Sequence, residues 1–121
     1  MITAARSALA ALIEGAGVTC MEFIPERITP PIAVMEPTSE WIASGEAFGE
    51  FRIGFDVTLV TQTASNRIST DNLDQMVEDV LTAVADTAGF YSTSVSAPAV
   101  LAVNNAEYLS VAVTIYQNTR L

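Results

Sequence analysis

Histidine and lysine are absent from this sequence, and cysteine occurs once, as Cys20. A Ser-His-Asp triad or a Cys-His pair needs an imidazole base, and zinc sites need several His or Cys ligands. A single cysteine also allows no disulfide within the chain, and no phosphate-binding glycine-rich loop is present. Nothing in the sequence therefore argues for an enzyme, and we expect no catalytic residues, no metal and no cofactor.

Positively charged residues are scarce. Asp and Glu number 14 against five Arg, which gives a net charge of −9 and a pI near 4.1. Proteins that grip nucleic acid carry basic runs or patches, and this sequence has none. It also lacks an apolar run of the roughly 18 residues that a membrane span requires. We expect that the protein neither binds nucleic acid tightly nor associates with a membrane.

The sequence is nevertheless apolar. Half of its residues are hydrophobic, 16% are charged and the mean hydropathy is +0.39. Two explanations stay open: a core rich in Ala and Val, or apolar surface that neighbouring subunits cover. At this length we expect a single domain over residues 1–121.

The N-terminal segment imitates a bacterial lipoprotein signal that ends at Cys20. However, Glu14 interrupts its apolar part, and Gly17 stands where such signals usually carry Leu. A helix over residues 3–16 fits better, with Thr3 as N-cap and Gly17 as its stop. We expect a protein used inside the cell, with Cys20 simply buried in a strand over residues 18–23.

Three prolines bracket the next apolar run. Pro30 and Pro31 precede residues 32–36, and Pro37 follows them. Proline lacks a backbone N–H and is confined to strand starts, sheet edges and bulges. We predict one short, sharply bounded strand there, paired with the strand over residues 18–23.

Residues 38–50 are rich in Ser, Gly and Glu but also hold Trp41, Ile42 and Phe48. Such a segment predicts a long loop. It either folds back over its own core or acts as an arm that touches a partner, since Trp is over-represented among interface anchors.

The strongest strand signal is FRIGFDVTLVT, residues 51–61, in which apolar odd-numbered residues alternate with mostly polar ones. A helix over residues 71–87, with Thr70 or Asp71 as N-cap and Gly89 as stop, offers an apolar stripe to cover the odd face. Carboxylates on its opposite side would make at most a weak cation site, so we interpret them as a solvated face. These are Asp74, Glu78, Asp79 and Asp86.

The C-terminal third predicts strands over residues 93–97, 99–103 and 108–117, with a turn at Asn104 and Asn105. Together the elements predict an α+β domain. We expect a mainly antiparallel β-sheet with two helices packed on one face, and a long loop between strands 2 and 3.

The order of these segments resembles the tail-terminator, or tail-completion, proteins of long-tailed, siphovirus-type bacteriophages. The resemblance runs from the first helix through IPERITPPIAVMEP, FGEFRIGFDVTLVT and DNLDQMVEDVL to EYLSVAVTIYQ, and so spans nearly the whole chain. The family has no catalytic residues to carry over.

The resemblance implies a structural virion protein that forms a ring, usually a hexamer. Such a ring caps the tail tube, ends its polymerisation and provides the head–tail joining surface. The implied partners are further copies of the chain, the tail-tube protein and a neck or head-completion protein, with DNA passing through the lumen without specific binding. The implied location is the tail–neck junction of the virion, assembled in the bacterial host cytoplasm. An acidic lumen would repel DNA phosphates.

In a ring, sheet edges are where neighbours or the tube add strands. We therefore place the candidate interface at Pro30, Pro31, Ile32, Val34, Trp41, Ile42 and Phe48. Two alternatives stay open. One is a small ligand-binding or regulatory domain with a pocket between the helix stripe from Leu73 to Val84 and the central strand. The other is a different ring-forming neck or head-completion protein.

Overall fold

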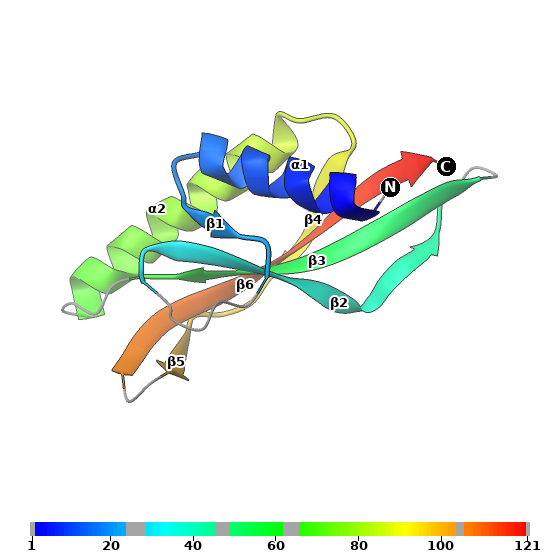
Figure 1. Cartoon of the computed structure of the whole chain (residues 1–121). Helices are drawn as coiled ribbons and strands as arrows, with labels where there is room; N and C mark the ends of the chain where they lie inside the picture. The colour runs from blue at the N-terminus through cyan, green and yellow to red at the C-terminus, as the bar shows by residue number, and fades with distance from the viewer. Residues whose placement is uncertain (1, 24–28, 46–48, 62–65, 104–105, 121) are drawn as a thin grey trace.

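A computed structural model of the chain describes residues 2–23, 29–45, 49–61, 66–103 and 106–120 (Figure 1). The elements are α1 (Ile2–Gly15), β1 (Cys20–Met21), β2 (Ile32–Ser44), β3 (Glu50–Val60), α2 (Asn66–Ala85), β4 (Phe90–Val95), β5 (Ala99–Val103) and β6 (Ala106–Arg120). Both helices lie over one face of the sheet, so the predicted α+β class is confirmed. Within the described part of the chain, no helix is long and apolar enough to cross a membrane.

The sheet has six strands in the order β1-β2-β3-β6-β4, and β5 also pairs with β6. Every pairing is antiparallel except that of β1 with β2, which is parallel. β3 lies at the centre, where Val57 is opposite Met35 of β2 and Val113 of β6. This register places the odd-numbered residues of β3 and β6 on the same face of the sheet.

That face forms the main core against the helices. Ile53, Phe55, Val57 and Leu59 of β3 are at most 1% exposed, as the alternation predicts. The helical residues packed against them recur at helical spacing, which is why these segments form amphipathic helices. They are Ala5, Leu9, Ala10 and Ile13 of α1 and Leu73, Met76, Val80 and Val84 of α2. Each fully buried large side chain contributes about 1.5–3 kcal/mol relative to exposure.

A second, smaller cluster lies on the opposite, helix-free face. Ile32, Val34 and Val60 are buried there, and the partly buried Leu101 and Tyr108 pack against them. The face is therefore not wholly solvated: its end near the start of β2 is apolar and covered.

The predicted short strand and long loop are wrong. β2 does not end at Pro37 but continues to Ser44 as a strand. Pairing with β3 shifts register after Pro37, which is opposite Phe55, and resumes at Ile42, opposite Ile53. The extra residues form a bulge, where a proline is tolerated because the regular ladder is already interrupted.

Other boundaries differ less. α2 begins at Asn66, so Thr70 and Asp71 lie inside the helix and are not its N-cap. The predicted stop at Gly17 is confirmed, since Gly17 adopts a positive φ of 96° directly after the end of α1 and its N–H donates to the Glu14 carbonyl. The predicted stop at Gly89 is wrong, because α2 already ends at Ala85, and Gly89, with a φ of 90°, lies in the turn that leads to β4. β4 is shifted toward the N-terminus relative to the predicted range, and β6 is longer at both ends. The predicted turn at residues 104–105 lies outside the described residues.

Candidate functional site

The proline pair and the start of β2 carry four of the predicted interface residues. Pro31 is exposed and Pro30 half-buried. Ile32 and Val34 are only 5% and 4% exposed, because the chain's own second cluster covers them. β1 pairs with β2 here, joining Cys20 to Ala33 and Met21 to Val34. The start of β2 is thus not a sheet edge, and among the described residues the open edge of β2 begins after Val34.

Trp41 and Ile42 lie in β2 rather than in a loop. Both are half-buried and pack against the main core, which favours the explanation that this segment folds back on the chain. The guanidinium carbon of Arg6 lies 5.8 Å from the centre of the Trp41 ring. The indole Nε1 is buried without a hydrogen-bond partner among the described residues. Phe48 lies outside the described residues.

Cys20 is 7% exposed, so its predicted buried position is confirmed. Burial, followed by the nearby carboxylates of Glu14 and Glu22, raises the pKa of its thiol to about 12. A thiol with this pKa is protonated at neutral pH and is a poor nucleophile. Cys20 therefore has a structural role.

The solvated interpretation of the acidic stripe on α2 is largely confirmed. Asp74, Glu78 and Asp86 are exposed, and Asp79 is half-buried. Asp79 accepts a hydrogen bond of 2.9 Å from Gln75 Nε2, one turn away on the same helix. In the described ranges, no three His, Cys, Asp or Glu side chains gather as a metal ion would require.

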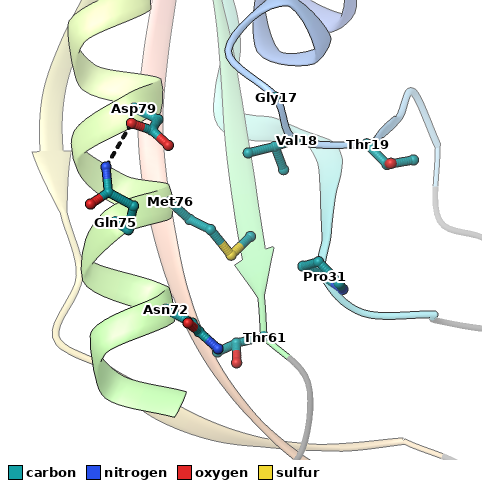
Figure 2. A pocket seen from close by; sticks show the side chains of 9 residues that line it. All are labelled: Gly17, Val18, Thr19, Pro31, Thr61, Asn72, Gln75, Met76 and Asp79. Atoms are coloured by element: carbon teal, nitrogen blue, oxygen red, sulfur yellow. Dashed lines mark hydrogen bonds between the residues drawn. The ribbon is translucent and has the colours of Figure 1, made fainter. Parts of the chain in front are cut away.

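A pocket of about 340 Å³ opens beside α2 (Figure 2). Met76 and Val18 supply its apolar part, with Asn72 and Thr61 at one end and Asp79 at the other. The remaining lining residues are Gly17, Thr19, Pro31 and Gln75. The chemistry suits a small, mostly neutral molecule with an apolar side.

This pocket is not where the sequence suggested. Leu73, Val80 and Val84 are at most 1% exposed and belong to the same buried cluster as β3. Side chains therefore fill the space between the helix stripe and the central strand. The pocket lies instead at the flank of α2, where the turn after α1 and the end of β3 approach it.

The helix-free face carries a polar and aromatic cluster near the start of β3. Tyr91 and Tyr116 are opposite each other in the ladder between β4 and β6, and their rings stack with centres 5.7 Å apart. The Arg52 guanidinium lies 4.6 Å from the centre of the Tyr116 ring. It also donates a hydrogen bond of 3.3 Å to the Glu40 carboxylate in an ion pair. We call Arg52, Tyr91, Tyr116 and Glu40 the arginine–tyrosine cluster.

The surroundings of Arg52 favour its charged form. A hydrogen bond to Tyr91, together with the fields of the two tyrosines and Glu40, raises the pKa of Arg52. A hollow of about 400 Å³ beside it also contains Glu50, whose negative charge disfavours an anion there. Sequence reasoning missed this cluster because only the register between distant strands brings Tyr91 and Tyr116 together.

No protein-family model matches this chain, and no curated protein matches it either.

Proposed function

We propose that the chain is the subunit of a ring, hexameric in the complete assembly, that ends the tail tube of a long-tailed bacteriophage and joins it to the head. The observation that carries this proposal is a sheet with two unlike faces and, among the described residues, an open strand edge on each side. Both helices cover one face, and the sheet is bordered by β1 and the part of β2 beyond Val34 on one side and by β4 and β5 on the other. A ring wall needs such an element, with one face turned outward, one inward, and edges free for neighbours.

The residues of the helix-free face fit contact with passing DNA. In the middle of β3 and β6, between the apolar cluster and the arginine–tyrosine cluster, the side chains opposite the core include the short polar residues Asp56, Thr58 and Thr114. The Thr114 hydroxyl donates a hydrogen bond of 2.7 Å to Asp56. Arg52, a cation on this face, is paired with Glu40. We propose that this face lines the channel, since its described side chains offer phosphates no basic stripe to grip.

The acidic stripe of α2 then lies on the outside of the ring. α2 covers the core face, and its exposed carboxylates point away from the sheet. The repulsion expected of an acidic lumen would therefore have to come from carboxylates of the helix-free face, among them Glu36, Asp56 and Glu50. In this arrangement, low friction for DNA derives more from the absence of a basic patch than from a strong negative field.

Light scattering coupled to size exclusion tests the proposal, on the protein alone and after mixing with the tail-tube protein of the same phage. We expect a hexamer, or a single chain that assembles into a ring on tube ends and stops their growth in electron micrographs. A single chain that leaves tube ends free to grow would contradict the proposal.

The pocket beside α2 favours one other function, a small ligand-binding or regulatory domain. It has apolar walls with a few polar groups, which is the usual character of a small-molecule site. That function predicts a monomer or dimer whose melting temperature rises with a small neutral ligand and does not respond to tube ends.

A further inference from the structure

One outer edge of the sheet consists of two strands, β4 and β5, which pair with successive parts of β6. β4 and β5 both pair antiparallel with β6, on the side of β6 away from β3. Between them Ser96 keeps the chain attached, because its N–H donates to the Ala112 carbonyl and its hydroxyl accepts from the Ala112 N–H, both at 2.9 Å. We call residues 90–103 the outer edge strand. Its far side has no strand partner within the described part of the chain.

The outer edge strand lacks the charges that usually protect a free edge. From Thr87 to Ala106 no residue is charged, in a chain whose net charge is −9. Residues 92–100 are all exposed, Val100 at 66% and Val95 at 39%. Natural edge strands are commonly protected by charged side chains, especially Lys, as well as by Pro and bulges. Here Pro98 and the bulge between Ser92 and Ser94 limit the length of pairing without adding charge.

The opposite edge of the sheet offers a matching groove. β1 ends at Met21, and beyond it a groove of about 340 Å³ runs along Met35 and Pro37 of β2. Phe23 lines this groove although it is 69% exposed, and Phe55 lies deeper. Charged groups stand around the apolar centre, as is typical of a protein interface. They are Arg6, Glu22 and Glu36.

The exposed apolar side chains concentrate at these two places. Among the described residues the large exposed ones are Phe23, Ile68, Val95 and Val100, and all except Ile68 belong to the outer edge strand or to the groove. We propose that the outer edge strand of one copy adds to the open edge of β2 in a second copy, with its valines covering the groove beside Phe23.

Charge favours a second copy as the occupant. Two chains of −9 repel each other, so their contact has to be made by a surface that adds no acid. An uncharged strand brings no further negative charge beside Glu22 and Glu36. A basic partner would instead be attracted to the carboxylates of α2.

The geometry is head-to-tail, because the two surfaces lie at opposite edges of the sheet. Such a contact closes into a ring when the rotation between neighbours allows it. The inference rests on the proposed ring and names the contact that builds it.

Light scattering of the wild type, Val100→Glu and Phe23→Glu tests the contact. Each variant should reduce the mass from the ring to a single chain, in solution or on tube ends, because a carboxylate enters the covered apolar centre. Ile68→Glu is the matched control, an equally drastic change of an exposed apolar side chain on α2, and should keep the ring. Far-UV circular dichroism and the melting temperature verify that each variant is folded.

Mixing the two disrupted variants gives the sharper result. Val100→Glu keeps the groove and Phe23→Glu keeps the outer edge strand, so together they should form a complex of two chains and grow no further.

A ring that survives both substitutions overturns the inference and leaves the proposed function standing. So does disruption by Val100→Glu alone, which would mean that the strand pairs with itself. Variants that keep the ring but lose the tube protein would assign the surface to the tube, also overturning it. A wild type that stays a single chain on tube ends refutes the proposed function itself.

Discussion

Replacing Gly54 by Ala should destabilise the protein, although the change adds only one methyl group. Gly54 lies in β3 opposite Tyr116 of β6 and beside the bulge of β2. A Cβ at this position would be 2.4 Å from Tyr116 Cε1 and 2.6 Å from Thr38 Oγ1. Real Cβ atoms essentially never approach other atoms below 3.0 Å, so the neighbours would have to move.

Neither neighbour moves freely. The Tyr116 ring stacks on Tyr91 and is covered by Arg52 on a ring face. The Thr38 hydroxyl donates to the Glu40 carbonyl at 2.9 Å and lies 3.4 Å from the Gly54 carbonyl. Overpacking of this kind costs about 1–3 kcal/mol. The lower entropy of the unfolded chain with Ala offsets about 0.4–1 kcal/mol. We expect a net loss of about 1–2 kcal/mol in the free energy of unfolding.

Urea unfolding followed by the fluorescence of Trp41, the single tryptophan, measures this loss. Gly15→Ala is the control, because a Cβ there meets no atom within 4 Å and the residue ends a helix. It should be neutral or stabilising by up to about 1 kcal/mol. The loss at Gly54 should shrink when Tyr116→Ala is present as well. A Gly54→Ala protein as stable as wild type would refute the argument from close approach.

Four further outcomes follow from burial and charge. Iodoacetamide should modify Cys20 slowly in the folded protein at pH 8 and rapidly in urea. Stability should fall as pH rises from about 9 toward 12, because the unfolded thiol ionises before the folded one, and Cys20→Ala should remove this part of the pH dependence. Leu9→Ala should cost about 2–5 kcal/mol in urea unfolding, since Leu9 is fully buried under α1. Arg52→Lys keeps a charge beside Glu40 but loses the planar contact with Tyr116, so this variant should unfold at a lower urea concentration than the wild type even in high salt, where the ion pair is screened.

Sequence reasoning located β3 and α1 to within a residue because burial in these elements follows a single period. In β3 the odd-numbered face is buried and most of the other face is less covered, so the alternation is legible. α2 was placed too late at its start. Thr70 and Asp71 resemble N-caps, and nothing in the local sequence shows that they lie within a helix that begins at Asn66.

The length of β2 could not be predicted from its local sequence. Pro37 favours a strand end, but the strand continues because Gly54 of β3 leaves room for the Thr38 side chain and the bulge. A proline at a bulge and a proline after a strand have the same local sequence. The arginine–tyrosine cluster was equally beyond local reasoning, because it depends on the pairing of β4 with β6 and of β3 with β6.

Of the two explanations that the sequence left open for the apolar composition, the structure bears out a core rich in Ala and Val, whereas a surface covered by neighbouring subunits belongs to the proposed contact. Ala5, Ala10 and Ala33 lie in the main core together with several valines. Apart from Ile68, the large exposed apolar side chains among the described residues lie toward opposite edges of the sheet, as Phe23 and Val100 do. A two-fold contact would need one surface complementary to itself and would leave the other uncovered. Two unlike edges, one grooved and bordered by charge and one projecting and uncharged, favour a head-to-tail contact, the kind from which a ring is built.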